Sequence, residues 1–362
     1  MTDQPLSVVV AGGGTAGHIE PALAVGEVLR ERHGANVVAL GTERGLETSI
    51  VPARGFELRL IDPVPIPRGK PWLLFGVPVK LVKSVNQTRQ VLKGTHAQAV
   101  FGTGGYVSAS AYLAARSLRI PFFVLETNAL AGMANKLGVK LGGVGFNAVA
   151  DSGMPGDVVG VPVRPGVGSD PDGVKARRGY ETWNLDPQRK TLLVTGGSQG
   201  AVRINQAVAG AVARLTADGF QVLHAYGRKN EPPSPHDGYT AVPYIDDMEA
   251  ALAVADMVVC RSGAMTVAEN SAAGLPAIYV PLPHGNGEQG LNSAHLVSTG
   301  AALRIDDAAL TPDSLYAAVS EVLGDQARLE RMRAALAESG AGDVAEDIAE
   351  RIAQAAQRRK EQ

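Results

Sequence analysis

The 362-residue chain lacks several features that would assign it to common protein classes. Its single cysteine, Cys260, excludes a framework of disulfide bonds, and the apolar run 257–259 before it predicts a buried thiol. No uninterrupted apolar run reaches the roughly 18 residues of a membrane-spanning helix. The formal net charge of −2 argues against nucleic acid as a partner. No signal sequence opens the chain, so we expect a protein that is soluble or peripheral to a membrane, in the cytoplasm.

What the chain does contain is the same glycine-rich turn twice, 183 positions apart. The apolar run 8–11 leads into Gly-Gly-Gly-Thr-Ala-Gly-His at 12–18, and the run 191–195 leads into Gly-Gly-Ser-Gln-Gly at 196–200. Each copy is typical of a buried strand, a tight turn and the start of a helix, where backbone N–H groups suit phosphate. Two copies predict an α/β protein with two doubly wound, Rossmann-like domains and a cleft between them.

Strand-like apolar runs alternate with helical patterns along the chain, which predicts βαβ units and a parallel sheet in each half. Strands are expected at 8–11, 36–40, 97–101, 121–125, 191–195, 221–225, 240–242, 257–260 and 277–281, and helices at 22–32 and 108–118. Proline and glycine concentrate at 160–166, which we interpret as the hinge. We therefore expect an N-terminal domain at 1–163, a C-terminal domain at 164–341, and a helix at 342–362 that packs back toward the first domain.

One segment departs from the balanced charge of the whole. Residues 54–93 contain eight basic and two acidic side chains, a net charge of +6. Within it, a short apolar stretch with basic flanks is typical of a surface that lies on anionic lipid. The residues predicted for that membrane patch are Trp72, Leu73, Leu74, Phe75, Val79, Lys80 and Lys83. An ordinary core helix with solvated ends explains the same pattern equally well.

The first turn also fits the Gly-x-Gly-x-x-Gly pattern of a dinucleotide site. That site expects an acidic residue at the end of the second strand, whereas this strand ends in Leu-Gly-Thr at 40–42 and the nearest acid, Glu43, lies beyond the glycine. His18 follows the turn directly. A neutral imidazole could remove a proton from a substrate hydroxyl near pH 7; a structural loop histidine is the alternative.

Two further segments of the first half carry polar or glycine-rich turns after a strand. Phe-Gly-Thr-Gly-Gly-Tyr at 101–106 resembles a phosphate-binding turn, although close backbone packing alone would explain its glycines. Asn128 follows the strand 121–125, at the edge where ligands of parallel sheets bind. It could hold a sugar or a carbonyl group, or simply cap the next segment.

The second half contains the sharpest local pattern, Cys-Arg-Ser-Gly-Ala-Met-Thr-Val-Ala-Glu at 260–269. A strand ends, Ser-Gly follows, and a helix begins. The N–H groups of Ala264, Met265 and Thr266 could hold a diphosphate, and Glu269 could accept both hydroxyls of a ribose. A capping box formed by Thr266 and Glu269 is the alternative, and it needs no ligand.

No metal-binding motif stands out, because the Asp-Pro-Asp at 170–172 has no supporting strand. Without a metal, a diphosphate leaving group must be stabilised by helix N-termini and by donors such as Ser198 and Arg164. The polar loop 281–289 could present amide and carboxylate groups to sugar hydroxyls.

In this order the motifs resemble those of one bacterial transferase family. Its members move N-acetylglucosamine from UDP-N-acetylglucosamine to lipid I, undecaprenyl-pyrophosphoryl-N-acetylmuramyl-pentapeptide, and so make lipid II. The resemblance covers nearly the whole chain, in the segments 13–18, 102–108, 126–128, 134–136, 160–164, 196–201, 244–248 and 261–269. It implies a GT-B fold, inverting chemistry without metal or cofactor, a β-1,4 product, and donor and acceptor sites in the C- and N-terminal domains respectively.

The resemblance also assigns roles to individual residues. It implies His18 as the best candidate for the base, with Thr15, Ala16, Gly17 and Asn128 in the acceptor-side wall. On the donor side it implies Ser198 and Arg164 at the diphosphate, Ile245 at uracil through its backbone, and Glu269 at the ribose. Gln289 would bind the sugar hydroxyls, and Ala264, Met265, Thr266, Val267 and Ala268 would form the helix start at the phosphates.

The family further implies attachment to the cytoplasmic face of the plasma membrane through anionic lipid, and contact with proteins of cell-wall synthesis and division. The chain departs from the family at three positions. Ala16 stands where a glycine is frequent, Leu125 where a histidine is common, and Glu288 where many members have the first of two glutamines.

Two other functions remain open from the residues. A UDP-N-acetylglucosamine 2-epimerase of the same fold would need no membrane patch, so the basic segment argues against it. A non-catalytic UDP-sugar-binding scaffold would keep Glu269 but has no need of His18.

Overall fold

The computed structural model describes residues 5–43, 45–64, 77–197, 199–284, 287–338 and 343–360. The chain forms two compact units, the first made of residues 1–165 and 342–362 and the second of residues 166–341. The division after Pro165 lies two residues beyond the boundary expected from the sequence. The last helix belongs to the first unit, so the chain passes between the units twice.

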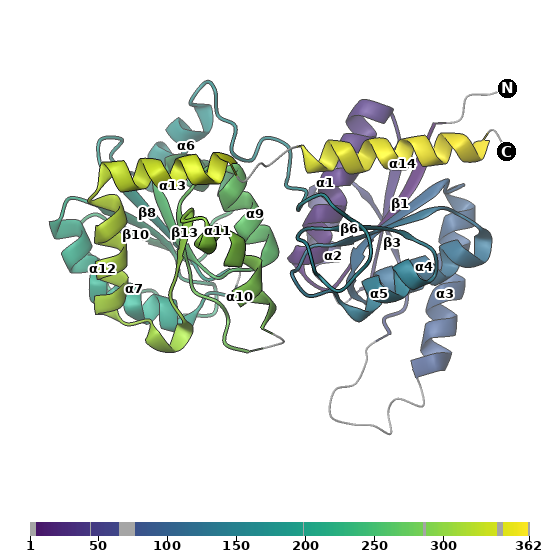
Figure 1. Ribbon diagram of the computed structural model, residues 1–362, viewed down its shortest axis with the longest axis horizontal. Helices are drawn as coiled ribbons and strands as arrows, with labels where there is room; N and C mark the ends of the chain where they lie inside the picture. Colours follow the sequence, from purple (N-terminus) through teal and green to yellow (C-terminus); the bar gives the residue numbers. More distant parts are fainter. Residues whose placement is uncertain are drawn as a thin grey trace. The chain divides into compact units, whose positions relative to one another are not determined.

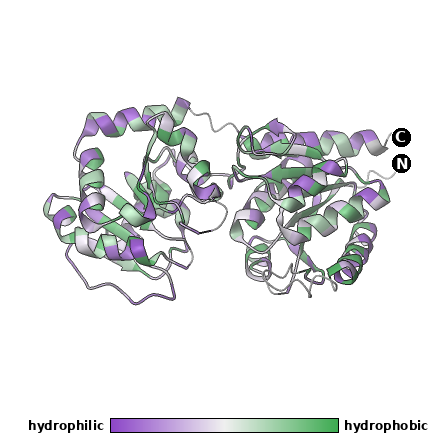
Figure 2. Ribbon diagram, turned by 60° about the horizontal axis from the view of Figure 1, so that its bottom comes forward, coloured by the Kyte–Doolittle hydropathy of each residue, from purple (hydrophilic) through white to green (hydrophobic). Residues whose placement is uncertain are grey.

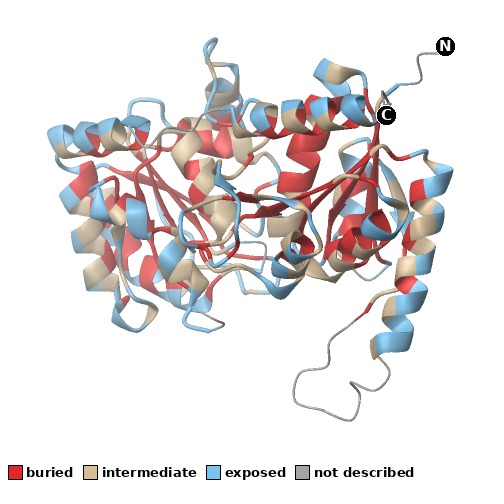
Figure 3. Ribbon diagram, turned by 45° about the vertical axis from the view of Figure 1, so that its right-hand side comes forward, coloured by how far each residue is buried: buried red, intermediate tan, exposed pale blue. Residues whose placement is uncertain are grey.

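The first unit is built on a seven-stranded parallel sheet in the order β3-β2-β1-β4-β5-β6-β7. Its strands are β1 Ser7–Gly12, β2 Asn36–Gly41, β3 Glu57–Leu60, β4 Ala99–Gly104, β5 Phe122–Glu126, β6 Val144–Asn147 and β7 Asp157–Val158. The strands β1, β4 and β5 are buried along their whole length, in red in Figure 3. Such strands have helices on both faces, which is why they are continuous apolar runs rather than alternating ones.

Among the described residues, six helices cover this sheet: α1 Ala16–His33, α2 Glu47–Ala53, α3 Val77–Gly94, α4 Gly105–Leu118, α5 Met133–Lys140 and α14 Val344–Lys360. α1 ends at Gly34, whose φ of 58° is the left-handed conformation that glycine adopts at little cost.

The C-terminal helix α14 is an integral part of the first core. It lies alongside α1 and across the edge of the unit (Figure 1). One face of α14 is buried in the same cluster as Ile19 and Leu23 of α1. The residues of that face are Ala345, Ile348, Ala349, Ile352 and Ala356, each at most 3% exposed. Their spacing of three and four residues is that of one helical stripe.

The second unit has a six-stranded parallel sheet in the order β10-β9-β8-β11-β12-β13. Its strands are β8 Thr191–Thr195, β9 Gln221–Ala225, β10 Tyr239–Val242, β11 Met257–Cys260, β12 Ala277–Tyr279 and β13 Ala302–Arg304. Its helices are α6 Val174–Trp183, α7 Val202–Ala217, α8 Met248–Val254, α9 Ala264–Ala272, α10 Glu288–Asn292, α11 Ala294–Ser298, α12 Pro312–Leu323 and α13 Gln326–Glu338. In Figure 2 the hydrophobic colour concentrates on the strands, whereas the helices carry both colours.

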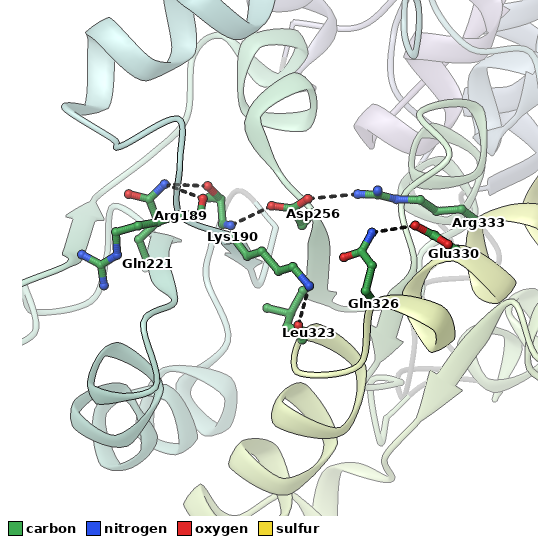
Figure 4. Close-up of polar contacts among 9 residues, drawn as sticks. Arg189, Lys190, Gln221, Asp256, Leu323, Gln326, Glu330 and Arg333 are labelled. Atoms are coloured by element: carbon green, nitrogen blue, oxygen red, sulfur yellow. Dashed lines mark hydrogen bonds and ion pairs between the residues drawn. The ribbon is translucent and has the colours of Figure 1, made fainter.

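Polar side chains tie the starts of the second sheet's strands to α12 and α13 (Figure 4). Asp256 accepts hydrogen bonds from the backbone N–H of Thr191 at 2.9 Å and from Arg333 of α13 at 3.1 Å. The Lys190 ammonium donates to the carbonyl oxygen of Leu323 at the end of α12, at 2.7 Å. These contacts lie at the N-terminal ends of the strands, so they stabilise the scaffold while leaving the opposite ends of the strands to the turns.

The two repeated turns occupy equivalent places in the two units. The first follows β1 and the second follows β8, and in each sheet the strand order reverses beside that strand. In open parallel sheets ligands bind outside the carboxyl ends of the strands at such reversal points. The second turn is longer, because α7 begins at Val202 whereas the offset of 183 places the start of α1 at 199.

The expected strands all exist, and those at 191–195, 221–225 and 257–260 have the expected bounds. The strands β3, β6, β7 and β13 were not anticipated, and all four carry exposed residues. The thiol of Cys260 is fully buried, as the sequence predicted, and burial raises its pKa to about 12. The loop 231–235 that follows Asn230 is mostly exposed.

The basic side chains of the segment 54–93 have different surroundings in the structure. Arg54 is not part of a free basic surface, because it contacts Glu20 and Glu27 at 2.6 Å each. Lys83 pairs with Asp62 at 2.5 Å. The first turns of α3 are exposed, and Figure 3 draws them mostly pale blue. Among the described residues, no helix combines the length and apolar character needed to cross a bilayer.

Candidate active site

The first glycine turn places His18 in the first turn of α1, half-buried above the sheet. The Nδ1 atom of its ring lies 3.2 Å from the carbonyl oxygen of Gly13 and 3.3 Å from the hydroxyl of Thr15. A carbonyl oxygen can only accept, so the contact with Gly13 is a hydrogen bond only when Nδ1 carries the proton. The other ring nitrogen, Nε2, then has a free lone pair and can act as a base.

The turn after β4 packs directly on the turn after β1. A Cβ atom at Gly104 would lie 2.9 Å from Nε2 of His18, and a Cβ atom at Gly105 would lie 2.6 Å from the carbonyl oxygen of Gly13. Both glycines have positive φ, 121° and 77°. The Thr103 hydroxyl donates to the carbonyl oxygen of His18 at 2.5 Å. Close packing therefore explains Gly104 and Gly105, and it brings the turn after β4 against the ring of His18.

Asn128 lies at the carboxyl end of β5 and is held by Glu126. Its backbone N–H and its side-chain amide donate to Oε1 of Glu126 at 3.0 and 3.3 Å. Oε2 of the same carboxylate accepts from the backbone N–H of Gly132 and from the Asn135 amide, each at 2.9 Å. Glu126 is 2% exposed and organises the whole loop, a role that we did not infer from the sequence. Within the described residues, the hydrogen bonds of the half-buried Asn128 use its N–H groups and leave its amide oxygen without a partner.

The second unit contains a cavity of about 500 Å³ at the carboxyl ends of β8 and β11. Both motifs that the sequence singled out in this half contribute to its wall. The lining includes Gly196, Gly197, Gly263, Thr266, Glu269 and Gln289, and also Arg261, Asn270, Met248 and Leu282. The volume is within the range of small-molecule sites.

The helix α9 begins where the sequence predicted. Its N-cap is Gly263, with no side-chain cap, and the first N–H to bond within the helix is that of Val267, which donates to the Gly263 carbonyl at 3.0 Å. The N–H groups of Ala264, Met265 and Thr266 therefore have no acceptor within the helix. Thr266 is the third residue of the helix rather than its N-cap, so the capping-box interpretation of Thr266 and Glu269 is wrong.

Glu269 and Gln289 enter the cavity from different elements. Glu269 lies on α9, and a helical side chain points back toward the helix N-terminus, here toward the open N–H groups. Gln289 lies on α10, and its Oε1 accepts from the backbone N–H of Leu282 at 3.0 Å. Gln289 lines the cavity, and its side-chain amide adds a hydrogen-bond donor to the groups there.

Arg261 is a functional candidate to which the sequence analysis gave no role. Its guanidinium donates to Asp307 at 2.6 Å and to the carbonyl oxygens of Val280 and Pro281 at 3.1 and 3.2 Å. Asp307 also contacts Arg203 of α7 at 3.1 Å. The positive group thus fixes the start of the 281–289 loop at the wall of the cavity. The sequence signal that could have pointed to Arg261 was its place in the 260–269 pattern.

A buried polar network supports the second glycine turn from below. His224 of β9 accepts from the Tyr239 hydroxyl at 2.6 Å and donates through Nε2 to the side-chain oxygen of Asn205 at 3.0 Å. The Asn205 amide donates to the carbonyl oxygen of Tyr226 at 2.9 Å. A Cβ atom at Gly200 would lie 2.1 Å from that same oxygen. Burial lowers the pKa of His224 to about 4, so the ring is neutral near pH 7.

The remaining residues expected at the site lie in different parts of the two units or outside the described residues. Ile245 is 3% exposed, in the loop between β10 and α8. Arg164 belongs to the first unit. Ser198 and Trp72–Phe75 lie outside the described residues. Val267 is buried on α9, and Ala268 lies next to it. The Asp170 carboxylate accepts from the N–H groups of Lys175 and Ala176 at the start of α6, so its part in the Asp-Pro-Asp sequence is local and structural.

Each unit thus contains polar groups of a different chemical character. The first has an imidazole with a free nitrogen among polar groups. The second has a cavity with helix N–H donors, a carboxylate and an amide, which suits a nucleoside diphosphate with an attached sugar.

Comparison with known proteins agrees with this division. The model of the glycosyltransferase family 28 N-terminal domain matches residues 8–141, and that of the family 28 C-terminal domain matches residues 191–348. The crystal structure of Acinetobacter baumannii MurG is similar over 97% of this chain and 100% of its own, with a TM-score of 0.76 and 26% identity. The calicheamicin glycosyltransferase CalG4, 18% identical with a TM-score of 0.71, shares the fold over 98% of this chain and 99% of its own. The fold of the two units is GT-B.

Relatives at higher identity carry one name, UDP-N-acetylglucosamine--N-acetylmuramyl-(pentapeptide) pyrophosphoryl-undecaprenol N-acetylglucosamine transferase. The protein from Corynebacterium efficiens is 61% identical over 353 residues, which is 98% of each chain. That from Mycobacterium avium is 49% identical and covers 96% of this chain and 88% of its own. The chain therefore belongs to glycosyltransferase family 28 and, within it, to the family of these N-acetylglucosamine transferases.

Proposed function

We propose that the protein transfers N-acetylglucosamine from UDP-N-acetylglucosamine to lipid I and so forms lipid II in peptidoglycan synthesis. The observation that carries the proposal is the cavity of the second unit, which combines an open helix N-terminus with Glu269 and Gln289 in a chain that is 61% identical to a transferase of this name. The sugar donor fits this cavity by its chemistry, because each of its parts meets a matching group.

On the donor side, the diphosphate lies at the N–H groups of Ala264, Met265 and Thr266, where the helix dipole favours negative charge. Glu269 accepts the hydroxyls of the ribose, and the Gln289 amide donates to hydroxyls of the sugar. The backbone of Ile245 holds uracil, and Arg164 and Ser198 add donors to the diphosphate. The phosphates are thus stabilised by fixed dipoles and cations of the protein itself.

On the acceptor side, His18 acts as the base. Its Nε2 takes the proton of the 4-hydroxyl of the N-acetylmuramyl group as that oxygen attacks C1 of N-acetylglucosamine. The bond from C1 to the phosphate oxygen breaks on the opposite face, UDP leaves with the bonding electrons, and the configuration at C1 inverts to β. Thr15, Ala16, Gly17 and Asn128 form the wall that orients the acceptor.

We also propose that the protein binds the cytoplasmic face of the plasma membrane through the start of α3. Val79 and Val82 are 74% and 60% exposed there, beside the exposed Lys80. Apolar side chains with neighbouring lysines suit an anionic bilayer surface. Lys83 is already paired with Asp62, so it contributes less charge than the sequence suggested. Trp72, Leu73, Leu74 and Phe75 extend this membrane patch in the proposal.

The test is incubation of the purified protein with UDP-N-acetylglucosamine and a water-soluble, short-chain analogue of lipid I. Formation of the disaccharide product and of UDP in equal amounts supports the proposal. Release of free N-acetylmannosamine or its UDP derivative would instead indicate a 2-epimerase. Donor binding without any product would indicate a binding scaffold.

A further inference from the structure

One peptide group of the first glycine turn connects the histidine to a buried carboxylate. The carbonyl oxygen of Gly13 lies 3.2 Å from Nδ1 of His18. The N–H of the same peptide group, which belongs to Gly14, donates to Oε1 of Glu47 at 3.1 Å. Glu47 and His18 therefore contact opposite ends of a single amide. Glu47 belongs to α2, and no role was assigned to it from the sequence.

The carboxylate is built into this position. Glu47 has no exposed surface. A Cβ atom at Gly13 would lie 2.8 Å from Oε1, so only a glycine lets the turn approach this closely. A Cβ atom at Gly41 would lie 2.8 Å from the Cβ atom of Glu47, so the strand end also makes room for it. Within the described part of the chain, Oε2 has no hydrogen-bond partner.

An amide transmits charge between its two ends. A carboxylate that accepts from the N–H end pushes electron density of the amide toward the carbonyl oxygen. That oxygen then accepts a hydrogen bond more strongly, since hydrogen bonds in a chain polarise one another. The effect is larger in a buried place than in water, because the local dielectric constant is lower. The carbonyl of Gly13 thus favours the tautomer of His18 in which Nδ1 is protonated and Nε2 is free.

We propose that Glu47 is a positioning residue for His18 and acts through the Gly13–Gly14 peptide. The carboxylate holds the turn, fixes the tautomer of the imidazole, and stabilises the positive charge that the ring gains when Nε2 takes the proton of the acceptor hydroxyl. No proton moves along the amide. This inference rests on the proposed function, in which His18 is the base.

The test begins with Glu47→Gln, which keeps an oxygen for the Gly14 N–H and nearly the same volume but removes the charge. We expect kcat to fall by about 10- to 100-fold, with the KM values for donor and acceptor nearly unchanged. Glu47→Asp keeps the charge at a shorter reach, and its kcat should lie between those of the parent and the glutamine variant. The matched control is Glu27→Gln, a mostly buried carboxylate of the same unit that pairs with Arg54 at 2.6 Å; its kcat should stay within about twofold.

The decisive comparison repeats Glu47→Gln in a His18→Ala background. If Glu47 acts through His18, the second substitution should lower kcat no further. An equal loss in both backgrounds, or a glutamine variant with the parent's kcat, would overturn the inference. If His18→Ala itself retains the parent's kcat, the proposed role of His18 fails instead, and the two failures are thereby distinguished.

A measurement on the unaltered protein complements these variants and does not depend on the folding of Glu47→Gln. With ¹⁵N-labelled histidine, the ring nitrogens of His18 can be assigned by comparison with His18→Ala. We expect the neutral ring to carry its proton on Nδ1. A ring protonated mainly on Nε2 would contradict the inference.

Discussion

Replacement of Glu269 by alanine should separate donor binding from stability. Glu269 lies on α9 and lines the cavity, and because Thr266 is not the N-cap, no capping box depends on the glutamate. Alanine is a better helix former than glutamate, so the helix itself should tolerate the change. The variant instead loses a charged acceptor for the ribose hydroxyls, worth about 1.5–3 kcal/mol, which corresponds to about 10- to 150-fold in the Kd for UDP-N-acetylglucosamine.

The assay is isothermal titration calorimetry with the donor, together with thermal unfolding. Ser271→Ala is the matched control, since Ser271 lies on the same helix but bonds the Val267 carbonyl at 2.9 Å and does not line the cavity. Its donor affinity should equal that of the parent. A Glu269→Ala protein with a lowered Tm and an unchanged Kd would refute the ribose assignment.

Three further predictions concern the metal, the pH and the membrane. Turnover should survive excess chelator, because protein dipoles stabilise the diphosphate; complete loss restored by magnesium or manganese would contradict this. The pKa of His224 lies near 4 in the fold against about 6.5 in the unfolded chain. The contribution of the neutral ring to the free energy of unfolding is therefore fully present above pH 6.5 and is lost as the pH falls toward 4. Up to about 3 kcal/mol of unfolding free energy should therefore disappear in urea titrations between pH 7 and 4, and the loss should be smaller in His224→Gln. The double variant Val79→Ser, Val82→Ser should bind anionic vesicles about tenfold or more weakly, with Tm and turnover on a soluble acceptor unchanged; undiminished binding would exclude the start of α3 from the membrane surface.

The strands that the sequence predicted with correct bounds are the central ones. β8, β9 and β11 are buried on both faces, so each appears as an unbroken apolar run between turns. β3 and β13 lie at sheet edges and have exposed residues, among them Arg304. Such short edge strands form because a neighbouring strand offers them hydrogen bonds, and the local sequence does not reveal that neighbour.

The C-terminal helix illustrates a second limit. Its apolar stripe, from Ala345 to Ala356, is visible in the sequence at helical spacing, and packing toward the first unit was expected. The sequence does not reveal which surface the stripe covers. That surface is α1, more than 300 positions earlier in the chain. An interaction at such separation leaves no periodic signal in either segment.

Among the site residues, glycine turns and helix starts were the most predictable. The open N-terminus of α9 follows from Ser-Gly after an apolar run, and the structure places the helix start at Ala264. Glu47 had no local signal of this kind, and the signal for Arg261 was limited to its place in the 260–269 pattern. Their roles depend on which backbone groups the fold brings to them, the Gly14 N–H in one case and the Val280 and Pro281 carbonyls in the other.

The measurement that tests the account most directly is the steady-state kinetics of His18→Ala beside its donor affinity. The account assigns the base to the first unit and the donor to the second, so the two effects should separate. We expect kcat with a saturating lipid I analogue to fall by about 10²–10⁴-fold, the usual contribution of a general base, while the Kd for UDP-N-acetylglucosamine stays within about twofold. A variant that turns over at nearly the parent's rate would contradict the account, as would one whose loss of activity is matched by an equal loss of donor affinity.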